Sequence, residues 1–376
     1  MAAPVAYLHD LRPLPVGTPL PQADIAAWLK RGLTRARGGR LEEQDRRAHV
    51  LYDRFARGGA VESRATTLPD FSKTAWSEMG LFKTTKEAAW HRPTLQARMA
   101  HYEKELLRLA GRAFPKGEKA PDYAVQVSCT GYASPHAVQR LVARRGWDSR
   151  VLHVGHMGCY AAVPAAAMAA KLVRGEAATG RRGARAALLL AELCTLHLKP
   201  GSNSDDQVVV NSLFADGAIR FDVSAEPRPR AFALLDSAEE IVKGSEREMT
   251  WRLQDSSFAM GLSREVPALI GAAVPGFVAR FLRRGGRRLA DVSHFAIHPG
   301  GPRVIDQALA SLGLPANAAP HSREILRRRG NMSSTTLPHV WHAMREDPAV
   351  REGSLVLSLA FGPGLTLVAN LLRKGR

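Results

Sequence analysis

Cys159 is the residue whose setting in this sequence most clearly suggests chemistry. It lies in the turn Gly158-Cys159-Tyr160, between an apolar stretch, residues 150–154, and an alanine-rich run, residues 161–173. The first stretch predicts a short buried strand and the second a close-packed helix. A cysteine at a helix N-terminus experiences a partial positive charge that favours the thiolate over the thiol. A lone buried cysteine is more often structural, but this setting makes Cys159 a candidate covalent nucleophile.

Two other polar residues could act with this thiol. His298 follows an apolar strand pattern and begins a glycine-proline turn, and Asn331 follows Gly330 at a predicted turn-to-helix junction. Taken singly, such residues often serve as turn formers or helix caps. Together they fit one chemistry, in which a cysteine attacks a thioester and an imidazole keeps the sulfur as a thiolate. Imidazole and amide N–H groups then stabilise the enolate that forms when a malonyl thioester loses carbon dioxide.

The surrounding sequence alternates strands with helices, which predicts an α/β architecture. Expected strands are residues 5–8, 123–128, 150–154, 186–193, 218–221, 231–235, 292–297, 354–360 and 364–372. Expected helices are residues 22–33, 42–57, 85–111 with a break at Pro93, 136–144, 161–173, 267–282, 304–312 and 330–344. A polar, proline-rich stretch at 224–230 is the best boundary. It divides the chain into residues 1–225, which carry the cysteine, and residues 226–376, which carry the histidine and asparagine.

Composition narrows the setting. The chain has 376 residues, and its 45% hydrophobic content is enough for sizeable cores. Its three cysteines have no CxxC or zinc-like spacing, which predicts a reducing cytoplasm, no disulfide framework and no metal. The N-terminus lacks the pattern of a signal peptide, and the apolar run 160–173 is too short to span a membrane.

The formal net charge of +18 has two compatible explanations. The arginines are spread along the chain, as expected for solvated surfaces, and they would also attract phosphate-bearing thioesters or an acidic carrier protein. No zinc finger, helix-turn-helix or aromatic-basic ladder is present, so a nucleic-acid partner is not expected.

Four segments resemble the type III polyketide synthases, the chalcone synthase superfamily with the thiolase fold, in type, order and spacing. They are Gly158-Cys159, His298-Pro299-Gly300-Gly301-Pro302, Gly330-Asn331-Met332-Ser333-Ser334 and Gly362-Pro363-Gly364-Leu365-Thr366. The second and third segments differ from those of the related ketoacyl synthase III enzymes. The resemblance covers residues 120–370 and points to the bacterial branch. It implies two related βαβ halves in a layered α-β-α-β-α core.

The resemblance also implies roles for individual residues. Cys159 is expected to accept the acyl group, with His298 and Asn331 as its catalytic partners. Phe214 corresponds to an aromatic gate between the CoA tunnel and the cavity, whereas the second gate of the family falls on Met260, a departure. The remaining positions that match the family's cavity are Glu192, Cys194, Ser333 and Trp251, the last where a small residue often stands.

Other matches concern CoA and the neighbouring subunit. Arg54 and Arg57 match two basic residues that bind CoA in the family, and a third position falls on Val61, a departure. Arg303, next to the histidine turn, is a further candidate for a phosphate contact. Residues 129–135 match a loop that reaches the neighbouring subunit's cavity, but the loop is shorter here.

The sequence therefore predicts a cytoplasmic, homodimeric type III polyketide synthase without a cofactor, metal or membrane span. It would condense malonyl-CoA repeatedly onto an acyl-CoA starter, with a fatty acyl group or a carrier-protein thioester as options, and release a pyrone or resorcinol-type product. Two alternatives remain: a ketoacyl synthase III-like enzyme that performs a single condensation, and a non-catalytic protein with the thiolase fold.

Overall fold

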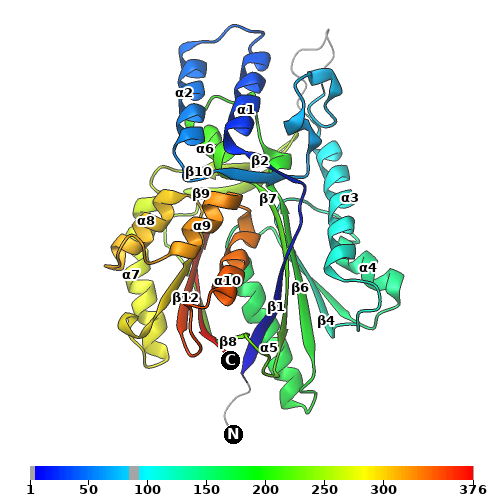
Figure 1. The fold of residues 1–376 in the computed structure, drawn as a ribbon, viewed down its shortest axis with the longest axis vertical. Helices are drawn as coiled ribbons and strands as arrows, with labels where there is room; N and C mark the ends of the chain where they lie inside the picture. The colour runs from blue at the N-terminus through cyan, green and yellow to red at the C-terminus, as the bar shows by residue number, and fades with distance from the viewer. Residues whose placement is uncertain (1–4, 84–92, 376) are drawn as a thin grey trace.

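A nine-stranded sheet organises the protein in the computed structural model, which describes residues 5–83 and 93–375 (Figure 1). The strand order is β11-β12-β13-β8-β1-β7-β6-β4-β5. The bounds are β1 Ala6–Leu14, β4 Tyr123–Ser128, β5 Arg150–Gly155, β6 Arg185–Leu193, β7 Asp216–Ser224, β8 Phe232–Ile241, β11 His294–Ile297, β12 Leu355–Gly362 and β13 Thr366–Lys374. The central strand β1 pairs antiparallel with both β7 and β8.

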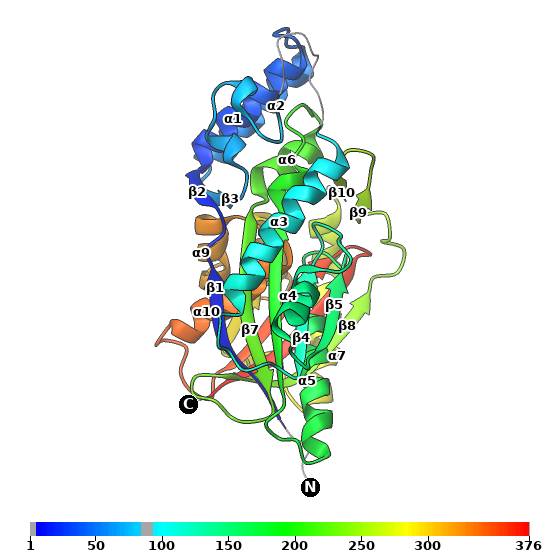
Figure 2. The same cartoon turned by 90° about the vertical axis from the view of Figure 1, so that its right-hand side faces the viewer.

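Helices form three layers around this sheet. The helices are α1 Gln22–Ala36, α2 Glu43–Arg57, α3 Leu95–Ala113, α4 Ala137–Arg145, α5 Ala162–Ala178, α6 Asp205–Leu213, α7 Val266–Arg284, α8 Pro302–Ser311, α9 Pro320–Arg329 and α10 Thr336–Glu346. Helix α5 contacts β6 and β7 on one side and β8 and β13 on the other, so it lies between the two arms of the sheet. Helices α3 and α4 cover the outer face of one arm, and α7 covers the other (Figure 2). This arrangement is the α-β-α-β-α layering expected from the sequence.

The middle layer is held by small side chains. Ala162, Ala166, Ala169 and Val173 of α5 are completely buried in one apolar cluster with residues of β1, β6 and β7. Small residues let a helix approach strands closely on more than one side, and a helix that is apolar over most of its surface belongs inside the protein. The alanine-rich run therefore fixes the helix that follows Cys159 at the centre of the molecule.

The predicted boundary lies between β7 and β8, which are the two neighbours of β1. Within the nine-stranded sheet, the strands of residues 123–224 lie on one side of β1, and the strands of residues 232–374 lie on the other. That arrangement is compatible with two halves, and the division at residue 225 stays a prediction.

Several elements differ from the expectation. Helices α6 and α9 and the hairpin of β9 Met249–Leu253 and β10 Phe258–Leu262 were not predicted, nor was the small pair β2 Thr18–Pro21 with β3 Ser63–Thr66. The helix expected from residue 330 begins only at Thr336, after a 3-10 turn, Ser333–Thr335. The helix expected over 85–111 is seen from Leu95 on, and residues 84–92 lie outside the described part.

The physical reasons are local. Helix α6 contains Val208, Val209 and Val210, and β-branched residues are typical of strands. Its start is set by Ser204, whose side chain accepts a hydrogen bond from the Gln207 backbone. Helix α9 is rich in arginine and buries only Ser322, Ile325 and Leu326, so its apolar periodicity is weak.

Helix α7 has the length and mean hydropathy of a membrane span, as the one such helix in the described ranges. Its buried face includes Ile270, Val274, Phe277 and Phe281, which join the apolar cluster under β12 and β13. A core helix passes the same test of length and composition, and this packing is that of a core helix.

Candidate active site

Cys159 lies in a tight turn between β5 and α5. His156 and Gly158 have positive φ angles of 57° and 85°, which reverse the chain before the helix begins at Ala162. The turn packs against the glycine-rich loop after β12, because a Cβ on Gly158 would come within 2.8 Å of Pro363 Cδ. The loop at 361–366 therefore serves as the surface on which the cysteine turn rests.

Asn331 is held by its backbone and by its side chain. Its N–H donates to Leu213 O at 2.8 Å, and its carbonyl accepts from Ala215 N at 2.9 Å, so it forms a bridge to Phe214. Its Nδ2 donates to Gly300 O at 3.2 Å, which connects it to the histidine turn. Its Oδ1 accepts from Ser333 N at 2.9 Å. The amide is therefore fixed in orientation.

The Cys159 thiol is within hydrogen-bonding reach of the Asn331 and Ser333 side chains. Burial raises the pKa of Cys159 to about 11, and these two hydrogen bonds lower it by less. Burial therefore opposes the resting thiolate, which stays a prediction. Helix α5 starts beyond the thiol, and the cost of burying a charge outweighs the local donors.

His298 follows β11 and is 2% exposed. Both of its ring nitrogens are buried without a hydrogen-bond partner in the described residues, so the predicted hydrogen bond to the cysteine is not formed here. Burial lowers the pKa of His298 to about 3, so the imidazole is neutral at physiological pH. A neutral ring offers one N–H donor and one acceptor nitrogen to an incoming group.

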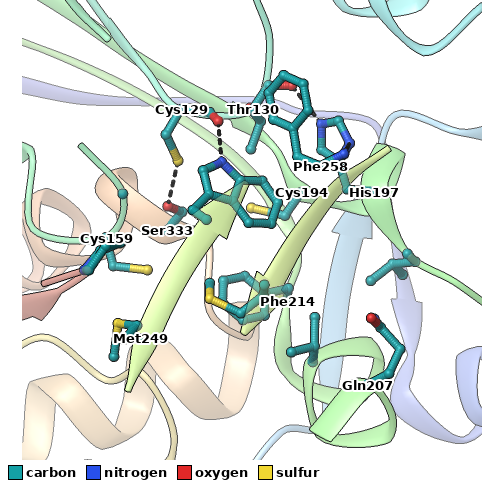
Figure 3. Close-up of a pocket in the computed structure, with 16 residues that line it drawn as sticks. Cys129, Thr130, Cys159, Cys194, His197, Gln207, Phe214, Met249, Phe258 and Ser333 are labelled. Carbon is teal, nitrogen blue, oxygen red and sulfur yellow. Dashed lines mark hydrogen bonds between the residues drawn. The ribbon is translucent and has the colours of Figure 1, made fainter. Parts of the chain in front are cut away.

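A small cavity of about 30 Å³ lies beside Cys159 (Figure 3). A void of this size holds about one or two water molecules. Its walls include most of the cavity residues that the sequence predicted: Cys194, Phe214, Trp251, Met260 and Ser333. Trp251 is fixed by a hydrogen bond of 2.6 Å from Nε1 to Cys129 O.

Cys129 and Thr130 of this wall belong to the predicted loop 129–135, whereas sequence reasoning missed six other members: His197, Leu198, Gln207, Val210, Met249 and Phe258. His197 accepts a hydrogen bond from Phe258 N at 3.0 Å and its Nε2 lies 2.7 Å from Thr130 O. Its ring stacks on Phe258 with 4.4 Å between centroids. The contact depends on the hairpin of β9 and β10, which had no strong turn signal in the sequence.

Glu192 was predicted to contact substrate, and the structure corrects this. Its carboxylate is fully buried and does not line the cavity. It accepts hydrogen bonds from Cys129 N at 2.9 Å, Thr130 Oγ1 at 2.8 Å, Ser128 Oγ at 3.3 Å and Ser334 Oγ. Because these donors surround the carboxylate, it supports the cavity wall from behind.

The three predicted CoA contacts lie on the surface. Arg54 and Arg57 are exposed on the last turns of α2, and Arg303 is exposed near the start of α8. Residues that follow α2 and residues of α8 line one surface cleft of about 470 Å³, which includes Gly58 and Pro302. This cleft thus lies between the end of α2, which carries Arg54 and Arg57, and the start of α8, which carries Arg303. The CoA contacts of these arginines stay predictions. Among the described residues, no group of three or more His, Cys, Asp or Glu is placed to hold a metal ion.

The fold matches that of solved type III polyketide synthases. The structure is similar to 1,3,6,8-tetrahydroxynaphthalene synthase from Streptomyces coelicolor A3(2), with a TM-score of 0.81 over 98% of this chain and 99% of that one at 21% identity. Residues 233–374 match the model of the chalcone and stilbene synthase C-terminal domain. The protein has the thiolase-like fold of these condensing enzymes.

Two curated relatives extend the match. The "alpha-pyrone synthesis polyketide synthase-like Pks18" of Mycobacterium tuberculosis is 30% identical over 256 residues, 66% of this chain and 63% of that protein. The 3,5-dihydroxyphenylacetyl-CoA synthase of Streptomyces toyocaensis is 31% identical over 258 residues, 66% of this chain and 64% of that protein. The match thus spans a little less than two thirds of these relatives. Residues 233–374 thus match the C-terminal domain of chalcone and stilbene synthases, and the chain is similar in sequence and fold to type III polyketide synthases.

Proposed function

We propose that the protein is a type III polyketide synthase that condenses malonyl-CoA repeatedly onto an acyl group held by Cys159. The observation that supports this most is a buried thiol within reach of the Asn331 amide, on the wall of a small cavity. Among the described residues, neither ring nitrogen of the buried His298 has a partner. In the proposed reaction, the Cys159 thiol carries the acyl group, and the His298 imidazole and the Asn331 amide assist its loading and extension.

Loading transfers an acyl group from CoA to the enzyme. The sulfur of Cys159 attacks the thioester carbonyl, and the carbon–sulfur bond to CoA breaks. The acceptor nitrogen of His298 takes the thiol proton and passes it to the leaving CoA sulfur, which balances the step. Because the resting thiol is neutral, approach of the substrate must bring the imidazole and sulfur into contact.

Extension requires loss of carbon dioxide from malonyl-CoA. The thioester oxygen gains negative charge as the carboxylate leaves, and it would accept hydrogen bonds from Asn331 Nδ2 and the N–H of His298. The enolate carbon then attacks the acyl carbonyl, and Cys159 leaves as a thiolate. The extended chain, now on CoA, returns to Cys159 for another round.

The cavity bears on the choice of starter. At about 30 Å³ it favours short acyl groups in this conformation, so a fatty acyl starter would require Trp251 or Met260 to move. For short and for fatty acyl starters alike, we propose release as a pyrone or a resorcinol-type product. The named functions of the relatives, an alpha-pyrone synthase-like protein and a dihydroxyphenylacetyl-CoA synthase, support a thioester-condensing role.

We also propose a cytoplasmic homodimer. Strand β5 ends the sheet, and Val151, Leu152 and Val154 on it are only half-buried. The polar side chains of β5 are the charged Arg150 and the imidazole of His153. An edge strand with so few charges is suited to pairing with a second copy of the chain. An acyl carrier protein remains an alternative acyl donor, for which the net charge of +18 is the support. Size-exclusion chromatography with light scattering at two protein concentrations tests the dimer.

The decisive experiment incubates the protein with malonyl-CoA and a panel of acyl-CoA starters of increasing length, with products identified by mass spectrometry. We expect two or more malonyl units in each product and the highest turnover with short starters. Products with a single added unit would favour the ketoacyl synthase III-like alternative. No turnover with any starter, and no acylated Cys159, would favour a non-catalytic protein with this fold.

A further inference from the structure

Arg64 is a fully buried arginine in the short strand β3, 1% exposed, with no carboxylate bonded to it in the described part of the chain. Its Nε donates to Gln22 Oε1 at 2.8 Å, and its Nη1 donates to Asn211 O at 2.9 Å and Phe214 O at 2.5 Å. Its Nη2 is buried and has no hydrogen-bond partner among residues 5–83 and 93–375. Burial lowers the pKa of Arg64 to about 9, so it is still charged at neutral pH.

These contacts give hydrogen-bond donors to the backbone carbonyls at the C-terminal end of α6. The last carbonyls of a helix have no partner within the helix and need one from elsewhere. Four successive carbonyls receive one here: Arg64 binds those of residues 211 and 214, Gln22 Nε2 that of Ser212, and Asn331 N that of Leu213. A cation at this end also opposes the helix dipole.

The same carbonyls determine where two site residues lie. Phe214, whose carbonyl Arg64 binds, contributes its ring to the cavity wall. Asn331 is bridged to the residues on both sides of Phe214, through Leu213 O and Ala215 N. A shift of the α6 end would therefore displace the ring of Phe214 and the amide of Asn331 together.

Gly330 shows how closely Arg64 approaches this segment. A Cβ on Gly330 would lie 2.8 Å from Leu213 O and 2.9 Å from Arg64 Cδ, and its φ is +70°. Because Gly330 has no side chain, the aliphatic part of Arg64 can pass close to the backbone immediately before Asn331. Arg64 packs against the segment that carries Asn331 and also binds the carbonyl of Phe214.

We infer that Arg64 is a positioning residue for decarboxylation: by clamping the end of α6 it holds the Asn331 amide and the Phe214 ring in their working positions. Gln22 assists, because Arg64 fixes its side chain in the orientation that binds Ser212 O. The inference rests on the proposed function, since decarboxylation is the step in which Asn331 acts.

The test measures malonyl-CoA decarboxylation in a Cys159→Ala background, where no acyl transfer competes. Adding Arg64→Met should lower kcat more than tenfold with little change in KM for malonyl-CoA. Arg64→Lys should recover part of the loss, because it keeps a cation for one carbonyl. In the otherwise wild-type chain, the rate of Cys159 alkylation by iodoacetamide should change less than threefold with Arg64→Met.

Arg98→Met is the matched control. Arg98 is 2% exposed, has a buried unpartnered Nη1 and binds one carbonyl, Ser256 O, away from the α6 end. We expect its melting temperature to fall about as much as that of Arg64→Met, with a decarboxylation kcat within threefold of the parent. If Arg64→Met does not fold, Gln22→Leu provides the weaker test, with a severalfold loss of kcat.

The outcomes separate the two hypotheses. Equal losses in the Arg64 and Arg98 variants, in proportion to melting temperature, would mean that Arg64 only stabilises the fold. Full kcat in Arg64→Met, or in Gln22→Leu where that variant is needed, would overturn the positioning role while the proposed function stands. An intact protein with no decarboxylation in any variant, including the parent, would instead overturn the proposed function.

Discussion

Two buried polar regions adjoin each other at Ser333 and Ser334, and they differ in how well they are satisfied. Around Glu192, four donors surround one carboxylate, one of them Ser334. The Cys159 thiol is within reach of the Asn331 and Ser333 side chains, and neither ring nitrogen of His298 has a partner in the part of the chain that the structure describes. Both regions are almost inaccessible to solvent.

The difference shows which region is built for support and which for chemistry. Buried polar groups in native proteins are nearly always hydrogen-bonded, because an unsatisfied one costs about 1–3 kcal/mol. The Glu192 region follows this rule and stabilises the wall. The His298 ring departs from it, because neither of its buried nitrogens has a partner in the described residues. An incoming thioester would supply a missing partner.

The largest effect should come from removing the nucleophile. Cys159→Ala should lower condensation by about a thousandfold or more, since no acyl-enzyme can form. Intact-protein mass spectrometry after incubation with acyl-CoA should show no adduct, whereas Cys194→Ala, at another position on the same wall, should still be acylated. Acylation of the Cys159→Ala protein would show that another residue is the nucleophile. The comparison of the Glu192 and Cys159 regions would then no longer hold.

Next in size is the loss of the donors. Asn331→Ala or His298→Gln should lower malonyl-CoA decarboxylation by about a hundredfold to a thousandfold, as for other donors to a developing oxyanion. Release of carbon dioxide measures this directly. A loss below threefold in both variants would show that neither group stabilises the enolate.

Alkylation of Cys159 measures the state of the resting thiol. Because burial raises the pKa of Cys159 to about 11, the thiolate fraction and the iodoacetamide rate should rise about tenfold per pH unit between pH 7 and 9. Stopped labelling followed by peptide mass spectrometry gives the rate. A rate that stays high and constant from pH 6 to 8 would reveal the thiolate–imidazolium pair that the sequence suggested.

Glu192→Gln tests the satisfied region. The amide would place an NH₂ group against N–H and O–H donors, so the free energy of unfolding should fall by about 2 kcal/mol. Decarboxylation should fall less than in Asn331→Ala. Glu226→Gln, at a half-exposed carboxylate paired only with Arg228, is the control and should change stability by less than about 0.5 kcal/mol. Chemical denaturation of the three proteins makes the comparison.

The smallest expected effect is a pH profile without a transition. Burial lowers the pKa of His298 to about 3, so the ring stays neutral from pH 8 down to pH 5. Decarboxylation by the Cys159→Ala protein should therefore vary less than twofold over this range. A transition with a midpoint near 6.5, the ordinary pKa of histidine, would show that His298 is not held as a buried, uncharged ring.

The alternation of strands and helices predicted the α/β class, and the resemblance to type III polyketide synthases supplied the layered arrangement. Residues 161–173 are one example, in which small apolar side chains indicated a helix packed on all sides. The sequence also predicted that Cys159, His298 and Asn331 act together, and this joint role stays a prediction. It could not show that Glu192 faces inward, because a strand residue's donors come from segments distant in sequence. His197 and Phe258 were missed because their contact depends on an unpredicted hairpin.

The position of β1 has a consequence for synthesis of the protein. Its two neighbours, β7 and β8, begin about 200 residues later in the chain and are therefore translated well after it. At roughly 5–20 residues per second, both edges of β1 wait about 10–40 s for their partners. The sheet therefore has many contacts between distant residues, which predicts slow folding and a nascent chain that depends on protection of its first strand.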